Sequence, residues 1–446
     1  MNRKITLMAA AVASLMTTVL QAAPDYSALG DTLTPVGAEK AGNADGSIPA
    51  YTGGLKTPPA GFQAGSGQYT DPFASEKPLL SIDAKNMDSY AGKLTEGSKA
   101  LMKLYPSFRI DVYPTHRSVW YPQYILDNTR QNAGKAGLDA SGLALIGAHA
   151  QVAFPIPANG QQAIWNHLTR YGTLSSETRA RAYNVDANGS RSLSSDMLCN
   201  WENPFWNPDP VQSAGNSRFV RCFYQGPARR VGEATMSLDV VDQHKGRRAW
   251  QYLPGQRRVR LAPDLAFDTP NPGTAGVQTF DEVGMYNGSI ERYDWKLVGK
   301  KEMYVPYNAY RAAFQSTPEQ LLGERHLNPD QLRWELHRVW VVEAQLKEGK
   351  RHIYKQRRFY LDEDSWAVLA TEAYDASNTL FKAGFAMQAS LYDSGGFSTE
   401  GTVFYDLIGG NYSTNATPFA SGKVKVIDPL PKREWTADAL TGAGVR

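Results

Sequence analysis

The amino-acid sequence predicts a mainly antiparallel β-sheet protein with helices, which is an α+β fold. Three successive runs carry this prediction, at residues 338–344, 353–361 and 366–374; they are rich in β-branched and aromatic residues, which suit a pleated and partly buried surface. The links between them are short and polar, whereas a parallel crossover needs about a dozen residues or more. A fourth run at 384–392 extends the sheet. We therefore expect a meander whose concave, apolar side needs a cover.

Composition is that of an ordinary globular chain. The 446 residues are 42% hydrophobic and 20% charged, with 47 basic and 44 acidic side chains. Binding to phosphate backbones needs a concentrated excess of Lys and Arg. The balanced charge therefore argues against nucleic acid as the main partner.

The first 22 residues have the pattern of a cleaved signal peptide. Arg3 and Lys4 precede the apolar run Ile5–Leu20, and Ala22 and Ala23 supply a small-residue cleavage site. The apolar run is shorter than the ~20 residues that a membrane-spanning helix needs. No Cys follows the site, so we expect an exported, soluble protein without a lipid anchor.

The two cysteines, Cys199 and Cys222, are expected to form a disulfide because the chain is exported. A metal site is the alternative, but His residues are scarce and unclustered nearby.

We divide the chain into a signal peptide (1–22), an N-terminal extension with helices and short strands (23–215), a half-barrel (216–410) and a polar, extended tail (411–446). Local patterns predict further elements: a helix within 81–104, a strand at 108–113, helices at 123–132 and 161–171, and short capped helices beginning at Thr317 and Asn328.

Alternation along the expected strands selects one row of side chains for the concave face. An antiparallel sheet with such a row either packs on helices as core or leaves a cavity for an apolar ligand. On the second interpretation, the cavity is lined by Met236, Leu238, Trp250, Tyr252, Trp340, Val342, Phe385 and Met387.

Motifs for catalysis are missing from the sequence. It has no Gly-rich phosphate loop, no nucleophile elbow and no His-Glu-x-x-His, and its seven His residues show no metal-ligand spacing. His337 and His352 are interpreted as solvated strand ends. Asp362, Glu363 and Asp364 suggest the paired carboxylates of a glycosidase, but turn composition favours a solvated loop. We expect neither enzyme activity, nor a metal, nor a cofactor.

Three stretches resemble one family. They are Gly37–Gly54, Trp250–Pro263 and Asp281–Ser289, and they are similar to sequences of uncharacterised exported proteins of Gram-negative bacteria, domain of unknown function 1329. The second half, from the Tyr-Leu-Pro hairpin to the strand at 366–374, is similar to the outer-membrane lipoprotein-sorting proteins LolA and LolB.

This resemblance implies a LolA/LolB-like incomplete β-barrel, covered by helices and by the irregular N-terminal extension, that holds acyl chains or another apolar molecule. It further implies a periplasmic location, peripheral to the outer membrane, and two partners: an outer-membrane β-barrel and an RND-type permease. The chain lacks the lipidation Cys of LolB and has an additional N-terminal half, which leaves the cargo open.

The leading hypothesis is a periplasmic carrier that binds a lipid or other hydrophobic molecule without chemistry. One alternative is an assembly protein that docks on an outer-membrane barrel through the aromatic loop Asn203–Pro210. Another is a hydrolase of lipids or glycans, for which the sequence offers no nucleophile.

Overall fold

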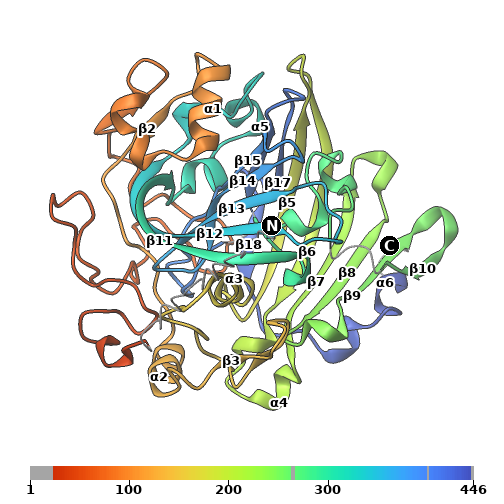
Figure 1. Ribbon diagram of the computed structural model, residues 1–446. Helices are drawn as coiled ribbons and strands as arrows, with labels where there is room; N and C mark the ends of the chain where they lie inside the picture. The colour runs from red at the N-terminus through yellow and green to blue at the C-terminus, as the bar shows by residue number, and fades with distance from the viewer. Residues whose placement is uncertain (1–23, 263–266, 399–400, 443–446) are drawn as a thin grey trace, which may run out of the picture.

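The computed structural model describes residues 24–262, 267–398 and 401–442 (Figure 1). The expected signal peptide at 1–22 lies outside the described residues. No helix in the described part of the chain combines the length and apolar character needed to span a bilayer.

Most of the described strands belong to one antiparallel sheet. They are β5 (Ser175–Val185), β6 (Arg191–Glu202), β7 (Asn216–Gly226), β8 (Ala234–Val240), β9 (Arg248–Leu253), β10 (Arg258–Leu261), β11 (Tyr293–Pro306), β12 (Trp334–Leu346), β13 (Gln356–Asp362), β14 (Val368–Tyr374), β15 (Leu380–Ala386), β16 (Thr402–Asp406) and β17 (Tyr412–Thr417).

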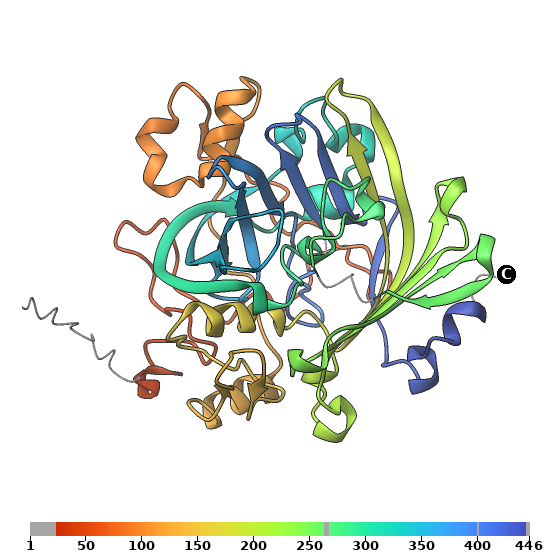
Figure 2. The same cartoon turned by 45° about the vertical axis from the view of Figure 1, so that its right-hand side comes forward.

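Their order in space is β11, then β12 to β17, then β5 to β10. The edge strands β11 and β10 do not pair with each other in the described residues, so the sheet curls without closing. This confirms the predicted incomplete barrel. In Figure 2 the yellow-green to green strands β5–β10 fan outward on one side, while β11 bends around the other. The predicted meander is β12–β15, with antiparallel pairing throughout. Its fourth strand is Leu380–Ala386, so only the first residues of the predicted run 384–392 belong to it.

Smaller strands extend this framework. β18 (Lys423–Val426) pairs with the first part of β5, beside the place where β17 leaves it. β1 (Leu80–Ile82) and β2 (Ile110–Val112) pair with each other, and β2 also pairs with β12 at one residue. β3 (Gly137–Leu138) pairs with β4 (Leu145–Ile146).

The sheet is wider than the expected limits of the half-barrel. β5 and β6 precede residue 216, while β17 and β18 follow residue 410. The expectation of an extended polar tail from residue 411 is therefore wrong. The polar residues of β17 are all buried, because this strand is central, between β16 and β5, and its backbone groups are paired on both sides. Polarity of the side chains alone did not reveal that position.

The α-helices are short. They are α1 (Glu96–Leu104), α2 (Gln123–Gln131), α3 (Gly160–Leu168), α4 (Pro210–Ser213), α5 (Pro318–Leu321) and α6 (Ala439–Gly442). The helix expected within 81–104 is divided into a 3₁₀ helix at Met87–Lys93 and α1. α1 begins at Glu96, because the Thr95 hydroxyl accepts a hydrogen bond from the backbone N–H of Ser98 at 3.0 Å and so caps the helix there. α1 packs on β14 and β15, α3 on β11 and β12, and α6 on β8 and β10.

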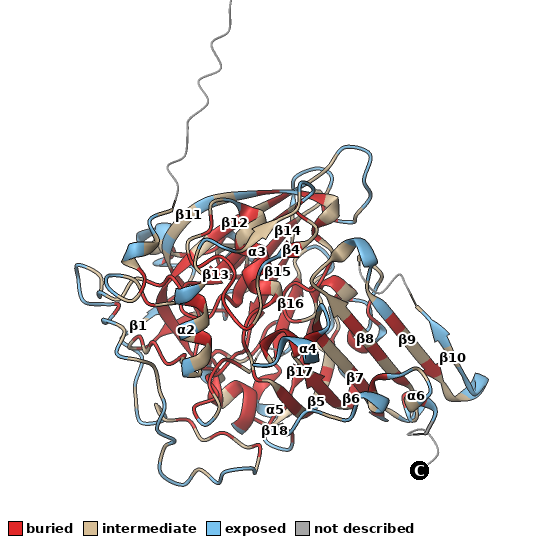
Figure 3. Cartoon of the chain, turned by 90° about the horizontal axis from the view of Figure 1, so that it is seen from below, coloured by how far each residue is buried: buried red, intermediate tan, exposed pale blue. Residues whose placement is uncertain are grey.

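The half of the sheet formed by β11–β16 is filled by the chain's own side chains. Tyr286, Trp295 and Phe359 form an aromatic cluster with ring centroids 5.3–5.7 Å apart. His167 of α3 lies against them, with Nε2 3.1 Å from the Tyr286 carbonyl oxygen. Figure 3 shows the buried residues concentrated in this half, while β10 and the outer loops are exposed. Any larger hollow must therefore lie elsewhere.

The predicted disulfide is present between Cys199 and Cys222, which are directly opposite each other on β6 and β7. The bond closes a separation of 23 residues. Loop closure of this length stabilises the folded state by about 3 kcal/mol in the chain-entropy account. We expect the double variant Cys199→Ala/Cys222→Ala to lose about that much in free energy of unfolding, measured by urea titration.

Reduction of the unchanged protein serves as the control and should give a similar loss. Equal midpoints for the oxidised, reduced and variant proteins would contradict a stabilising role.

Candidate functional site: three adjoining pockets beside strands β5–β8

The inner face of β5–β8 lines an apolar pocket. Its row on β7 is Val220, Cys222 and Tyr224, and its row on β8 is Thr235 and Ser237. Val220 pairs with Ser237 and Cys222 with Thr235, and directly paired residues point to the same side of a sheet. The space between atoms is about 850 Å³, part of it open to solvent. The other lining residues are Thr178, Ala180, Met197, Cys199, Trp201, Met236, Arg247, Asn271, Gly273, Phe280, Val283, Asn287, Asn415 and Ala416.

Residues 271–289, which we call the covering segment, close one side of this pocket through Phe280 and Val283. Two buried acids fasten the segment to the other half of the sheet. Asp281 lies 2.7 Å from Arg357 Nη1 and 3.0 Å from His352 Nε2. Burial alone raises the pKa of Asp281, but Arg357 and His352 outweigh it and hold the pKa well below its usual range.

Glu282 is the second of these acids. It accepts a hydrogen bond from the Tyr354 hydroxyl at 2.8 Å and lies 3.4 Å from Lys382 Nζ. The backbone N–H of Thr279 donates to the same carboxylate at 2.8 Å, which completes a capping box. The cover of the pocket is therefore fixed by ion pairs and hydrogen bonds.

A polar pocket of about 960 Å³ adjoins the apolar one and shares Arg247 and Asn287 with it. Its walls are α3, the ends of β7 and β8, and residues 287–291. The lining residues are Trp165, Leu168, Ser217, Arg218, Asp239, Val240, Gln243, His244, Gly246, Arg247, Phe267, Asn287, Gly288, Ser289 and Glu291.

A third pocket, of about 700 Å³, touches both of the others. It shares Thr178, Trp201 and Ala416 with the apolar pocket and Leu168 and Arg218 with the polar pocket. We call it the middle pocket. The three hollows thus adjoin one another beside the inner face of the sheet, and the one lined by Val220 and Cys222 is the most apolar of them.

The residues predicted to line a cavity lie mostly elsewhere. Met236, Leu238, Trp250 and Tyr252 are on β8 and β9, and their side chains pack with Trp435 and Leu440 of the C-terminal segment in a separate core cluster. This cluster is on the other face of the sheet from Val220 and Cys222. Of the four, Met236 is among the residues that line the apolar pocket. Alternation defines two rows but does not say which row faces the hollow.

The other four predicted residues belong to the principal core or pack against it. Met387 lines the middle pocket, and together with Phe385 it lines a smaller hollow of about 330 Å³ near β16. Val342 is fully buried among core residues. Trp340 stacks on Trp366 with the ring centroids 6.2 Å apart.

Sequence reasoning missed the inner row of β5–β7. Its members Thr178, Ala180 and Met197 fell in the part of the chain assigned to an extension. The disulfide was the available signal, because Cys199 and Cys222 join two of the strands that line the pocket.

The acidic turn between β13 and β14 is buried, so the expectation of a solvated loop is wrong. Asp362, Glu363 and Asp364 are 0, 2 and 3% exposed. Arg117 binds Asp364 through two parallel hydrogen bonds of 2.8 and 2.7 Å, and Lys300 Nζ lies 2.8 Å from Glu363. Buried carboxylates need such partners.

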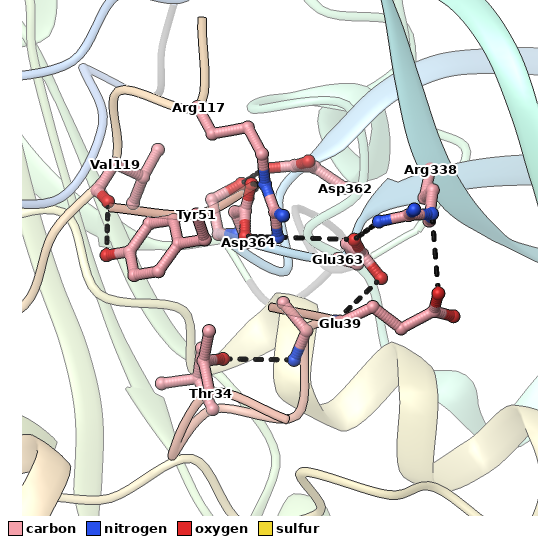
Figure 4. A network of polar contacts seen from close by, with 12 residues as sticks. Thr34, Glu39, Tyr51, Arg117, Val119, Arg338, Asp362, Glu363 and Asp364 are labelled. Carbon is pink, nitrogen blue, oxygen red and sulfur yellow. Dashed lines mark hydrogen bonds and ion pairs between the residues drawn. The ribbon is translucent and has the colours of Figure 1, made fainter. Parts of the chain in front are cut away.

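The N-terminal stretch that resembles the family signature docks on this turn (Figure 4). Glu39 donates its backbone N–H to Glu363 at 3.3 Å, and its carboxylate lies 3.0 Å from Lys300. The Tyr51 ring lies under Arg117, 5.3 Å from the guanidinium carbon, and its hydroxyl donates to the Val119 carbonyl at 2.8 Å. Gly37 has φ of 94°, and a Cβ there would lie 1.8 Å from the Pro155 oxygen. The signature is therefore a docking sequence for the acidic turn.

The predicted solvated positions of His337 and His352 are also wrong, since both side chains are at most 2% exposed. Each binds an acid: His337 lies 3.0 Å from Glu335 and His352 3.0 Å from Asp281. His337, Asp362 and Asp364 bring candidate ligand atoms within 4.8 Å of one another. Because both Asp364 oxygens already accept from Arg117, we assign this cluster a structural role.

The buried turn makes stability depend on pH. Burial and the neighbouring Asp364 carboxylate raise the pKa of Asp362 from 3.8 to about 6. The folded state then holds a proton between about pH 4 and 6 that the unfolded state has lost, so this group lowers the free energy of unfolding as pH rises through that window.

The side chain of the variant Asp362→Asn carries no charge at any pH. Between pH 4 and pH 7 we therefore expect its free energy of unfolding to rise by about 1–3 kcal/mol relative to that of the unchanged protein. Urea titrations at several pH values measure the difference. Parallel curves for the two proteins would contradict the raised pKa.

The Arg117–Asp364 pair gives a second expectation. Arg117→Met leaves a buried carboxylate without its cation and should cost about 3–5 kcal/mol of stability. The double variant Arg117→Met/Asp364→Leu removes both charges and should recover most of that loss in thermal and urea unfolding. Similar losses in both variants would show that packing, rather than charge pairing, decides stability here.

Comparison with known proteins identifies a family model and a relative that match most of the chain. The family model described as "Protein of unknown function (DUF1329)" matches residues 81–441. "Uncharacterized protein PA3922" of Pseudomonas aeruginosa is 40% identical over 409 residues, which cover 90% of each chain.

Solved structures give more distant similarities. A putative outer membrane lipoprotein-sorting protein domain from Vibrio parahaemolyticus has 14% identity and a TM-score of 0.44, and the match covers 63% of this chain and 98% of that one. A DUF1329 family protein from Desulfovibrio piger has 12% identity and a TM-score of 0.42, with coverage of 60% and 92%. The LolA superfamily protein NE2245 from Nitrosomonas europaea has 12% identity and a TM-score of 0.36, with coverage of 64% and 100%.

With TM-scores this low, the assignment depends on the sequence matches, which include the motifs at 250–263 and 281–289. The chain belongs to the DUF1329 family.

Proposed function

We propose that the protein is a periplasmic, non-catalytic carrier that holds a lipid or other hydrophobic molecule in the apolar pocket beside β5–β8. The observation that carries the proposal is that pocket, which is partly open to solvent and is lined mainly by apolar side chains and a disulfide. Ligand sites of small molecules are concave and mostly apolar, with a few polar groups that fix the orientation of the ligand. The signal-peptide pattern and the disulfide support an oxidising, extracytoplasmic compartment.

The resemblance stated above supports a role in traffic across the envelope, with an outer-membrane β-barrel and an RND-type permease as partners. A carrier must release its load, and the inner row of β5–β8 suits this because the hollow is partly open to solvent.

The aromatic loop Asn203–Pro210 does not present its rings as a docking surface, as the assembly-protein alternative would require. Phe205 and Trp206 are 2 and 1% exposed and belong to the principal core. Trp206 packs edge-on against Tyr171 at 5.4 Å. These rings are therefore not available to a partner.

The hydrolase alternative has one geometric candidate near the polar pocket. Ser141 Oγ and Asp139 Oδ2 lie 3.1 and 3.0 Å from His244 Nε2. In a catalytic triad the serine and the carboxylate bind opposite nitrogens of the imidazole, so that the ring can take the serine proton. Here both contact the same nitrogen, and Ser141 donates to Asp139 at 2.6 Å. This arrangement supports a turn anchored on His244 rather than a nucleophile.

Filling the pocket tests the carrier role. Val220 faces the hollow and its neighbour Phe219 faces the other side, where it packs on Trp435. We expect Val220→Trp to weaken binding of a fluorescent fatty-acid probe at least about tenfold, because excluding two buried methylenes costs about 1.6 kcal/mol. Phe219→Trp is the matched control and should bind as the unchanged protein does.

Native mass spectrometry of protein isolated from the periplasm of its host provides the second measurement. We expect a co-purified apolar molecule. Its absence, together with no uptake of the probe by the unchanged protein, would refute the carrier role.

A further inference from the structure

The inner row of β7 changes character along its length. From one end it reads Arg218, Val220, Cys222 and Tyr224, with a cation first and then residues that line the apolar pocket. Alternate residues of a strand point to one side and advance ~6.6 Å per pair, so this row spans ~20 Å. A molecule that lies along it meets Arg218 at one end and then the apolar side chains of Val220 and Cys222. At the far end the guanidinium of Arg230 lies over the Tyr224 ring, 3.8 Å from its centroid.

One hydrogen-bond donor of Arg218 has no partner among the described residues. The side chain is 9% exposed and faces both the middle and the polar pockets. Its Nη2 donates to Asn287 Oδ1 and lies 3.4 Å from Asp239 Oδ2. Its Nε is buried and has no hydrogen-bond partner among the described residues. An unmet buried donor on a charged group costs free energy, so it is expected to be satisfied in the working state.

Trp201 supplies a second unmet donor beside it. Trp201 lies on β6 opposite Val220 and lines both the middle and the apolar pockets. Its indole Nε1 is buried and likewise without a partner in the described part of the chain. An indole N–H and a guanidinium N–H are donors only. Their unmet partner must therefore be an acceptor, and oxygen atoms of a ligand fit this requirement.

The electrostatic surroundings favour a negative charge on that acceptor. Arg170, Arg218 and Arg247 line the middle and polar pockets, whose acidic lining residues are Asp239 and Glu291. Asp239 binds both Arg218 and Arg247, and Glu291 lies 3.7 Å from Lys350. Nearby His167 responds to these cations: burial and then Arg170, with a smaller contribution from Arg218, lower its pKa well below the usual value.

We propose that the junction of the three pockets binds the anionic head group of an amphiphile. Arg218 Nε and Trp201 Nε1 donate to the head-group oxygens, and the acyl chain lies along Val220, Cys222 and Tyr224. The ligand class is a carboxylate or phosphate that carries one or more acyl chains. This inference rests on the proposed carrier function and specifies its ligand.

The test compares three ligands of equal chain length: dodecanoate, dodecyl phosphate and uncharged dodecanol. Each displaces a neutral fluorescent probe from the full-length mature protein. We expect at least one of the two anions to bind about tenfold or more tightly than dodecanol, since hydrogen bonds to charged groups are the stronger class. The anion that gains more identifies the head group as carboxylate or phosphate.

Arg218→Gln should remove most of this preference and leave dodecanol binding unchanged. Trp201→Phe keeps an aromatic ring but removes one donor, so it should reduce the preference for anions over dodecanol by a smaller factor. If Arg218→Gln fails to fold, Trp201→Phe tests the head-group site in its place. Arg248→Gln is the matched control, because Arg248 is an exposed neighbour on β9 outside the three pockets. It should bind as the unchanged protein does.

Equal affinity of the unchanged protein for the anions and dodecanol would overturn the head-group site while leaving the carrier role standing. The same would follow if Arg218→Gln and Trp201→Phe weakened all three ligands alike. Failure of every ligand, dodecanol included, would instead overturn the carrier role.

Discussion

The buried acidic turn at Asp362–Asp364 is the constraint on which the rest of the structure depends. Three consecutive carboxylates without solvent are tolerated only where cations surround them, and Arg117, Lys300 and Arg338 come from three separate parts of the chain. Arg117 lies in the loop after β2, Lys300 on β11 and Arg338 on β12. Pairing the acids therefore draws the N-terminal extension onto the meander. The signature residues Glu39 and Tyr51 complete this arrangement.

This attachment explains why the two halves of the sheet differ. In the half formed by β11–β16, the N-terminal extension with its helices α1 and α3 supplies apolar side chains that fill most of the interior, as the aromatic cluster around Phe359 illustrates. Over the apolar pocket, the inner face of β5–β8 is closed on one side by the covering segment, which is held at Asp281 and Glu282 by charges on β13 and β15 and by Tyr354. A short segment fastened across a wide, curved sheet leaves space beneath it. The hollow is thus a consequence of where the covering material is attached.

The same geometry determines how a ligand would be oriented in the proposed carrier. The apolar pocket ends at a junction where guanidinium groups and an unmet indole donor meet. A hydrocarbon alone would leave these donors unsatisfied, whereas an anionic amphiphile would satisfy them and bury its chain in the same step. The two proposals stand on different observations: the carrier role on the apolar lining of the pocket, and the ligand class on the donors at its polar end.

The sequence by itself determined the elements whose signal is local. β-branched and aromatic runs with short polar links specified the meander β12–β15, capping residues specified the starts of α5 and the turn at Pro329, and the compartment argument specified the disulfide.

Tertiary structure decided what depends on distant partners. Met236 and Trp250 share a row on the strands, but the C-terminal Trp435 and Leu440 cover that row, and only their position shows that the hollow lies behind Val220 and Cys222. The acidic turn was interpreted as solvated because its cations lie 25 to 247 residues away along the chain. Alternation and composition describe a segment and its two faces, whereas burial depends on which other segment packs on each face.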